Sequence, residues 1–550
     1  MKVVMELLLK YKYLFLVVIF SVVASFSLLH SGLPPTHDGE YHVVRFWQFD
    51  KVLRDGDLYP RWAPDLNFGL GIPLFSYIYP LPNYVASFLH TFGVSFIDAF
   101  KLNLFFAIIM AGIFFYLWTK NFFGSLGAMV GTVFYLFSPY LFVDVYIRGS
   151  VGEVWALAFF PGFLWAITEL ILNDNKKFLP VSILFLSLVI FSHNILALLF
   201  FPFAITYSFI LILISKEKRN KIINLVKVVL ISLGLSSIFW LPAILETKYT
   251  MGLQIYDFRT NFPDLYQLIF PSWGSGFFGG GIQNEMSVQI GIANLMGVLL
   301  SFFVLYKLVK KKDFRKTIVT FFILSFFIVL FLMQDISLIL WEKIPLMNYF
   351  QFPWRFLSLT ILICSFLAAS IFSVFKSKFF SLFLVIFAVL LTYNYAHPAY
   401  YLEREDSYYQ TRSNFIDGTN SIGNVFNTIW IKGDFIREKD IVDSLDKNIK
   451  IDKREIKSTK YKFNTSSDVN FPLILNTAYF PGWVAKIDGK RVNTSANKKG
   501  LITFNVPKGD HKVEVSFSDT SIRTLSLAIS LIAFVLVIKL FFQNWYIRYK

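Results

Sequence analysis

The sequence has little charge and almost no cysteine. Only 16% of its 550 residues are charged, well below the roughly one quarter that is typical of soluble domains, so the chain is not a soluble globule. Disorder is excluded as well, because 55% of the residues are hydrophobic. The single cysteine, Cys364, lies in an apolar run, which excludes a disulfide framework and a thiolate metal site.

Long apolar runs account for most of the chain. A helix of about 20 apolar residues is long enough to cross a bilayer. The first run, 13–29, is not closed by a small-residue cleavage site, which favours a membrane anchor over a signal peptide. The pattern predicts a mostly α, polytopic membrane helix bundle of about twelve spans, at 13–29, 98–118, 124–143, 152–172, 178–194, 195–215, 222–244, 286–309, 315–333, 354–375, 379–396 and 521–542.

The positive charges predict the orientation of the bundle. Lys and Arg cluster in short loops such as 216–221 and 307–316, and such loops usually face the cytoplasm. All clusters face the same side of the membrane only if residues 80–95, which open with two prolines, do not cross it. We therefore predict that this segment is a helix lying in the membrane interface. Both termini are then expected in the cytoplasm of a multi-pass plasma-membrane protein. The net charge of +16 is therefore explained by topology and does not indicate nucleic-acid binding.

The composition divides the chain into three predicted parts. Residues 1–396 form the bundle, with a first exterior loop at 31–97 that contains interfacial helices. Residues 397–520 are polar and alternate in places, as in 511–517, which predicts a small extracytoplasmic β-rich domain. Residues 521–550 form a last span and a cytoplasmic tail.

Ionisable side chains are densest at the start of the first exterior loop. His37, Asp38, Glu40 and His42 follow the first span closely. The pattern from Glu40 to about residue 54 is helical, with one apolar face. If the helix starts near Asp38, then Asp38, His42 and Arg45 share one side.

Three interpretations of Asp38 remain open at this stage. It can be a helix N-cap, which stabilises the helix by about 1 kcal/mol. It can belong to a divalent metal site with His37, Glu40 and His42, although these neighbouring residues reach one ion only if the chain bends. It can also be a catalytic carboxylate, such as a general base.

Several ordered motifs resemble a known family. They are the stretch 56–75, Tyr79-Pro80-Leu81-Pro82, 146–153, Ser192-His193-Asn194, 351–357, and 479–483 leading to Asp488-Gly489-Lys490. In this order they resemble the bacterial YfhO-like proteins and the membrane domain called "6-pyruvoyl-tetrahydropterin synthase-related", within the GT-C fold membrane glycosyltransferases. That domain's name does not describe chemistry here, since nothing resembles the three-histidine zinc site of the synthase.

The resemblance implies a function and a set of site residues. GT-C enzymes of this kind transfer a sugar from a polyprenyl-phosphate carrier to an acceptor on the outer face. Asp38 matches the acidic residue of their first exterior loop, and Glu40 completes an Asp-x-Glu pattern. We therefore predict Asp38 and Glu40 as catalytic.

Basic residues are needed to hold the carrier phosphate, and guanidinium groups suit phosphate well. We assign Arg148 and Arg355 to this role, with membrane-interface anchoring as the alternative for both. Glu153 can be an ion-pair partner of Arg148 or a substrate ligand, and His193 can be a structural residue or a ligand. The predicted set that binds substrate and phosphate comprises His42, Arg45, Arg148, Glu153, His193 and Arg355.

The expected partners are a polyprenyl-phosphate-linked sugar, membrane lipids and an extracytoplasmic glycan or lipid acceptor, and no nucleic acid. No cofactor is firmly implied, and a divalent metal is the one candidate. A transporter or flippase of lipid-linked sugars is an alternative, but it should carry charges near the middle of its spans. A non-catalytic scaffold with a glycan-binding β-domain is the other alternative.

Overall fold

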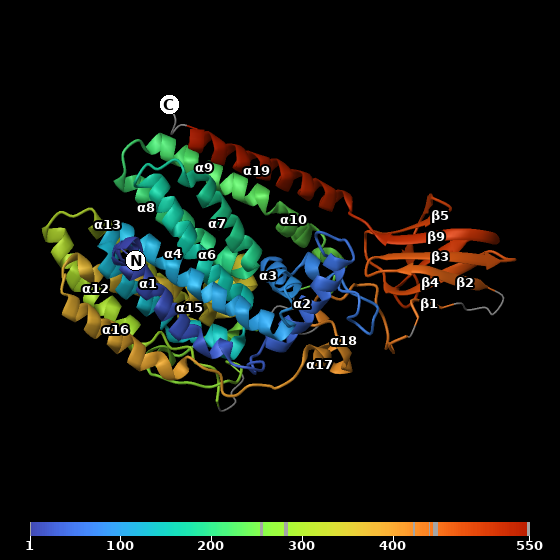
Figure 1. Cartoon of the computed structure of the whole chain (residues 1–550), viewed down its shortest axis with the longest axis horizontal. Helices are drawn as coiled ribbons and strands as arrows, with labels where there is room; N and C mark the ends of the chain where they lie inside the picture. Colours follow the sequence, from blue (N-terminus) through green and yellow to red (C-terminus); the bar gives the residue numbers. More distant parts are fainter. Residues whose placement is uncertain are drawn as a thin grey trace.

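The computed structural model has two parts, a helix bundle and a β-sandwich that stands at one end of it (Figure 1). It describes residues 2–252, 257–279, 284–421, 424–438, 440–443 and 449–546. The end of the predicted cytoplasmic tail, 547–550, lies outside the described residues. The predicted fold class, a mostly α membrane bundle with a small β-rich domain, is confirmed.

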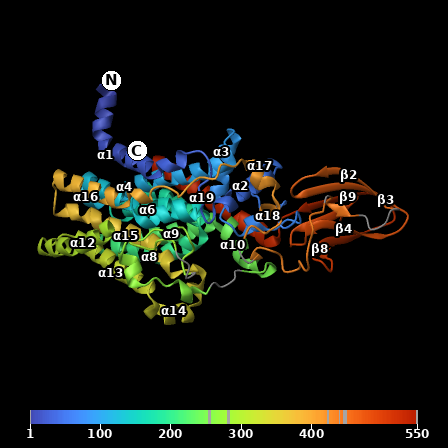
Figure 2. The same cartoon turned by 90° about the horizontal axis from the view of Figure 1, so that it is seen from below.

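Within the described residues, nine helices are long and apolar enough to cross a membrane, or ten if a pair bent by 68° counts as one span. Figures 1 and 2 show both chain ends on the half of the bundle away from the sandwich. The bundle helices are α1 (Lys2–Ser25), α4 (Phe96–Leu136), α6 (Val151–Ile171), α7 (Phe178–Ser192), α8 (Asn194–Ile214), the bent pair α9 (Lys218–Leu235) and α10 (Ser237–Leu245), α12 (Ile292–Lys310), α13 (Arg315–Leu332), α15 (Leu357–Ser370), α16 (Lys378–Thr392) and α19 (Ser521–Tyr546).

Two local features explain why this number is lower than the predicted twelve. α7 has only 15 residues, fewer than the roughly 20 of a typical span. α4 contains the predicted run 98–118 and most of the run 124–143, and Gly124 between its two halves has a non-helical φ of 69°. The rings of Phe115 and Tyr135 stack with centroids 4.6 Å apart, whereas positions so far apart on one straight helix would be separated by about 30 Å. The chain therefore folds back at Gly124, and α4 is a helical hairpin.

The first exterior loop carries two helices. α2 (Gly39–Arg54) begins and ends where the sequence predicted a helix, and α3 (Leu81–Thr91) lies inside the predicted interfacial segment 80–95. Val43 and Phe46 of α2 are fully buried, and α2 packs against α3 and α4. The apolar face of α2 is thus covered mainly by protein.

Short helices connect these elements. They are η1 (Phe26–Leu29), η2 (Leu74–Ser76), α5 (Pro139–Phe142), the π-helix η3 (Val143–Arg148), η4 (Thr247–Tyr249), η5 (Phe258–Asn261), α11 (Leu265–Ile269), η6 (Asp335–Ser337), α14 (Leu338–Lys343), η7 (Pro345–Phe350), η8 (Pro353–Phe356), η9 (Ile371–Ser373), η10 (Tyr393–Tyr395), α17 (Asp406–Thr411) and α18 (Ser413–Ile416).

The β-sandwich consists of two antiparallel sheets in the described residues. One sheet has the order β1 (Val442–Asp443), β4 (Phe471–Ala478), β8 (Leu501–Val506), β7 (Ser495–Ala496). The other has the order β2 (Lys450–Ile456), β3 (Lys460–Ser467), β9 (Gly509–Phe517), β5 (Trp483–Ile487), β6 (Lys490–Val492). Burial alternates along β3, so one face of the sheet turns to the core and the other to solvent.

The chain between bundle and sandwich is fastened to the bundle. The first strand begins at Val442, and the earlier helices α17 and α18 pack against α2. Leu402 exchanges two backbone hydrogen bonds with Leu33, of 2.8 and 2.9 Å. The Asp406 carboxylate accepts from the amides of Phe96 and Ile97 at 2.7 and 3.1 Å, which caps the first turn of α4. We call residues 402–420 the strap.

A buried arginine of the bundle, Arg523, contacts the sandwich. Arg523, at the start of α19, donates from Nε and Nη2 to Glu246 at 2.9 and 2.8 Å, and neither residue is exposed by more than 1%. Arg523 Nη2 also donates to the carbonyl of Pro481 in the sandwich at 3.1 Å. Arg523 therefore links the two parts of the chain.

Candidate functional site

Backbone pairing places the start of α2 beside the π-helix η3. The amide of Asp38 donates to the carbonyl of Arg148, and the amide of His37 to that of Ile147, both at 2.9 Å. Gly149 permits this approach, because its φ is +64° and a Cβ there would lie 2.2 Å from Thr36 Oγ1. Asp38 and Arg148 are therefore neighbours, although they are far apart in the sequence.

η3 supplies two charged residues to a buried cluster. Arg148 binds Glu153 through both terminal nitrogens, at 2.7 Å each, and also donates to Asp144. Asp144 and Glu153 are 0% exposed and Arg148 is 6% exposed. π-Helical turns are rare and often occur at functional sites. The ion-pair interpretation of Glu153 is confirmed.

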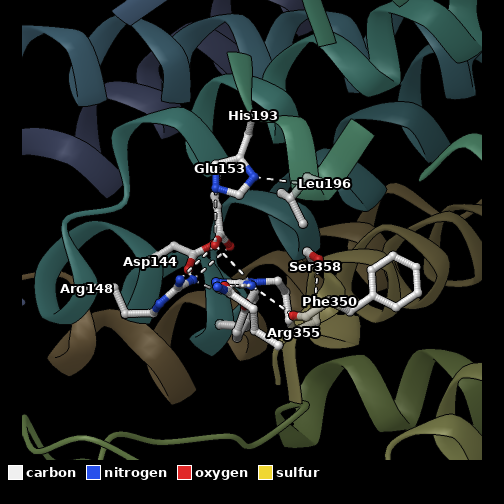
Figure 3. A network of polar contacts seen from close by, with 10 residues as sticks. Asp144, Arg148, Glu153, His193, Leu196, Phe350, Arg355 and Ser358 are labelled. Carbon is white, nitrogen blue, oxygen red and sulfur yellow. Dashed lines mark hydrogen bonds and ion pairs between the residues drawn. The ribbon is translucent and has the colours of Figure 1, made fainter. Parts of the chain in front are cut away.

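Arg355 and His193 complete this cluster from other helices (Figure 3). Arg355 Nε lies 3.2 Å from Glu153 Oε1, and its Nη1 donates to the carbonyl of Phe350 at 2.9 Å. His193 Nδ1 accepts from the Leu196 amide at 3.1 Å, so it caps α8. Its Nε2, which therefore carries the proton, lies 3.8 Å from Glu153 Oε1.

The Asp38 carboxylate lies outside this set of pairs. It is half-buried and occupies the N-cap position of α2 without capping the helix, and within the described residues it has no hydrogen bond or ion pair. The Gly39 amide donates to Thr36 Oγ1 instead, at 3.1 Å. The capping interpretation of Asp38 is therefore wrong.

Arg45 and Tyr79 are the polar neighbours of Asp38. Arg45 donates from Nε and Nη2 to the side-chain and backbone oxygens of Asn420, at 2.7 and 2.8 Å. Burial lowers the pKa of Arg45, and Tyr79 and Asp38 oppose this effect. Burial also raises the pKa of Tyr79, whose ring lies 4.9 Å from that of His193. Asp38, Arg45 and Tyr79 thus form a partly open group in front of the buried cluster.

The other predicted residues of the loop have separate partners. The Glu40 carboxylate pairs with Arg404 of the strap at 2.8 Å. His37 Nε2 lies 2.8 Å from the carbonyl of Ser275. His42 is buried against Phe46 and Phe100, and burial together with Arg45 and His193 holds its pKa well below the ordinary value.

These partners bear on the metal hypothesis. Within the described residues, no three His, Cys, Asp or Glu side chains are grouped as a metal site requires. His37, Asp38, Glu40 and His42 point to different neighbours, as the short spacing between them suggested. Among the described residues, Asp38 is the only one of the four whose side chain makes no hydrogen bond, ion pair or ring contact.

The buried cluster has an uneven electrostatic balance. Burial and the nearby Glu153 carboxylate raise the pKa of Asp144 from 3.8 to about 8. Asp144 therefore neutralises less of the positive charge of Arg148 and Arg355 than an ordinary aspartate would.

Sequence reasoning missed Tyr79 and Asn420 as parts of the site. Tyr79 belongs to one of the motifs that carried the family resemblance, and a Cβ on Gly152 would lie 2.4 Å from its ring. The sequence therefore contained a motif that could have identified Tyr79 as a site residue. Asn420 lies in the strap, 375 residues after Arg45, and no local pattern connects the two.

The fold and the site define a polytopic membrane protein with a charged cluster at the sandwich end. The chain belongs to the 6-pyruvoyl-tetrahydropterin synthase related domain family of membrane proteins, whose family model matches residues 75–402. The model of the bacterial membrane protein YfhO matches residues 435–530. The predicted family membership is confirmed.

Individual relatives are distant. An uncharacterized protein of Lactococcus lactis subsp. cremoris (strain MG1363) is 22% identical over 366 residues, which are 63% of this chain and 55% of that protein. The chain thus spans about half the length of this curated relative.

Two solved structures are similar over 70% of this chain. Arabinofuranosyltransferase AftD from Mycobacteria has a TM-score of 0.44 at 13% identity, over 26% of its own chain. The Archaeoglobus fulgidus oligosaccharyltransferase has a TM-score of 0.40 at 15% identity, over 56% of its own chain. At these TM-scores the likeness carries no argument about fold or activity.

Proposed function

We propose that the chain is a membrane glycosyltransferase that transfers a sugar from a polyprenyl-phosphate carrier to an acceptor on the extracytoplasmic face. The observation that carries the proposal is the state of Asp38. Its half-buried carboxylate makes no hydrogen bond or ion pair within the described residues, whereas Glu153 and Glu40 nearby are both paired. A carboxylate kept open in this way is available as a base.

The reaction needs one proton acceptor. Asp38 takes the proton from the acceptor hydroxyl while the hydroxyl oxygen attacks the anomeric carbon. The bond between that carbon and the phosphate oxygen breaks, and its electron pair leaves with the carrier phosphate, with inversion at the sugar. Because the leaving phosphate is already a stable anion, no general acid is required.

We favour a different arginine for the direct contact with the phosphate. Arg148 and Arg355 are only 6% and 4% exposed and face Glu153, whereas Arg45 is partly exposed. Arg45 donates only from Nε and Nη2, both to Asn420, so among the described residues its Nη1 has no hydrogen-bond partner. We assign the direct contact to Arg45. The guanidinium groups of the buried cluster then stabilise the leaving phosphate at longer range, because they are held in place before the reaction.

Glu40 and His193 take supporting roles in this proposal. Glu40 holds the strap through Arg404, and His193 caps α8. A divalent metal, if the reaction uses one, would be held by Asp38 together with the carrier phosphate. Activity measured in EDTA, and again after Mg²⁺ or Mn²⁺ is restored, decides this point.

Asp38→Asn tests the proposal directly. Loss of a general base lowers the rate by about 10²–10⁴-fold, so a host that lacks the gene should not recover its envelope glycan when it expresses this variant. Mass spectrometry of the glycans gives the readout. Membrane insertion and melting temperature should match those of the wild type.

Asp468→Asn is the matched control, because Asp468 is an exposed carboxylate of the sandwich. This variant should restore the glycan fully. Restoration of the glycan by Asp38→Asn would remove Asp38 from the mechanism, and normal glycans in the gene-deleted host would overturn the proposed function.

One observation also favours glycan binding by the sandwich. The solvent face of the five-stranded sheet has an open groove of about 900 Å³ whose lining includes Lys450, Asp452, Asn464, Asp510 and Lys512. Carboxylates and amides of this kind bind sugar hydroxyls. We propose that this groove holds the acceptor glycan. The double variant Asp452→Asn/Asp510→Asn should then raise KM for the acceptor and leave kcat unchanged.

A further inference from the structure

An exposed apolar surface lies away from the charged site. It belongs to η6, α14 and η7, residues 335–350, which we call the foot. Figure 2 shows α14 standing out from the flank of the bundle, on the side of α13. Ile336 is 73% exposed, Ile339 55% and Tyr349 54%, and Ile344 and Leu346 are exposed as well. An apolar surface of this kind usually marks a place where a protein meets another protein or a membrane.

The foot is not a loose segment. On its inner side, Trp341 is fully buried, and its Nε1 donates to the carbonyl of Leu332 at 3.1 Å. The Trp341 ring lies 5.5 Å from that of Phe258 and 6.1 Å from that of Phe356. The exposed side chains are therefore presented by a packed structure, and their exposure needs an external partner.

The apolar surface continues from a candidate membrane span. Leu324, Ile328 and Phe331 of α13 are exposed and lie on one helical face, and Ile336 and Ile339 follow directly in the chain. α14 has only six residues, far fewer than the roughly 20 needed to cross a bilayer. It must lie along the membrane if it meets lipid.

Two of the three charged residues of the foot, Glu342 and Lys343, fit the same position, and the third, Asp335, lies exposed at its first residue, where the chain leaves α13. The carboxylate of Glu342 is paired with Arg259 at 2.8 Å. Lys343 is exposed, and a lysine stem can follow an apolar surface while its ammonium group stays in water. Tyr349 adds the kind of side chain that is enriched at membrane interfaces.

We propose that the foot is immersed in the lipid interface of the leaflet on the sandwich side. Its exposed apolar side chains contact acyl chains, as those of interfacial helices do at depths of about 5–10 Å. The carbonyl of Phe350, at the end of the foot, accepts from Arg355. The foot therefore sets the depth of the buried charge cluster relative to the lipid headgroups. This inference does not depend on the proposed enzymatic activity.

Site-specific fluorescence in proteoliposomes tests the proposal. The full chain is labelled with bimane at Ile339→Cys or Leu346→Cys. Native Cys364 is fully buried and serves as the unlabelled background, to be checked with the wild type. Leu324→Cys on α13 is the lipid control. Leu58→Cys is the aqueous control, because Leu58 is 82% exposed on the first exterior loop.

We expect phosphatidylcholine brominated at acyl carbons 6 and 7 to quench the labels at 339, 346 and 324 but not the label at 58. Iodide should quench the labels of the foot roughly threefold less than the label at 58, since bilayers exclude ions. Quenching by iodide as strong as at 58, with no effect of brominated lipid, would overturn the proposal. Protection from both quenchers would also overturn it, because a protein partner would then cover the foot.

Discussion

Glu153 and Asp38 are carboxylates at the same end of the bundle, and their surroundings are opposite. Glu153 is 0% exposed and receives two hydrogen bonds from Arg148, with Arg355 Nε 3.2 Å away. Asp38 is half-buried and pairs with nothing among the described residues. Their backbones are nevertheless connected, through the bond from the Asp38 amide to the Arg148 carbonyl.

This contrast separates two uses of charge. A buried ion is stable only if it is paired and hydrogen-bonded, so the cluster around Glu153 is a structural necessity once its charges are buried. A half-open carboxylate keeps its hydration and needs no partner. The cluster therefore fixes the position of η3, and η3 fixes the position of Asp38. Stability and chemistry are divided between the two carboxylates.

The difference between the two carboxylates is tested most directly by removing each in turn and comparing the loss of stability. Glu153→Ala removes the carboxylate that two buried guanidinium groups share, which should cost about 3–5 kcal/mol of stability. Asp38→Ala removes a half-open group and should change stability by less than about 0.5 kcal/mol. Melting curves of the purified protein in detergent measure both. Equal losses would show that Asp38 is as deeply embedded in the fold as Glu153.

Arg45 extends the test from stability to enzymatic activity. Arg45→Ala removes the proposed contact to the phosphate, and a hydrogen bond to a charged group contributes about 1.5–3 kcal/mol. Because each 1.4 kcal/mol is about tenfold, kcat/KM should fall roughly 10- to 100-fold. Arg54→Ala is the control on the same helix, since Arg54 pairs with Asp50 at 2.6 Å and lies away from Asp38. Equal effects of the two variants would remove Arg45 from the phosphate site.

The sequence predicted the local parts of this arrangement. Hydropathy marked the apolar runs, and the periodicity of α2 placed Asp38, His42 and Arg45 on one side of a helix. The spacing of Arg148 and Glu153 within a few residues made their pairing foreseeable. Contacts such as Arg355 with Glu153 and Arg45 with Asn420 were not foreseeable, because they depend on which helices pack together.

The same limit applies to the fold. The hairpin at Gly124 falls on the first residue of the predicted run 124–143, so the sequence indicated a break close to this position. No sequence pattern predicted that Glu246 pairs with Arg523, since each residue taken alone is a single charge beside an apolar run. Only the packing of α10 against α19 brings them together.

Asp144 provides a pH-dependent test of the buried cluster. A carboxyl group whose pKa is raised in the folded protein binds its proton more tightly there than in the unfolded chain. Its pKa rises from 3.8 to about 8, so stability should fall as the pH rises between these values, by at most about 1.4 kcal/mol per pH unit. Asp144→Asn is always neutral and should remove this slope. Parallel pH profiles of the melting temperature for wild type and variant would contradict the assignment.

The weakest expected effect concerns Glu40, which is close to Asp38 in sequence but paired with the strap. Its bond with Arg404 joins side chains that are 35% and 31% exposed, and pairs of this kind usually contribute about 0–1 kcal/mol. Glu40→Ala, Arg404→Ala and the double variant form a cycle in which the coupling energy should lie below about 1 kcal/mol, measured from melting curves. A larger coupling would place Glu40 with Glu153 among the residues that hold the fold. In its contribution to stability, Glu40 would then resemble the paired Glu153 and would no longer lie between Glu153 and the unpaired Asp38.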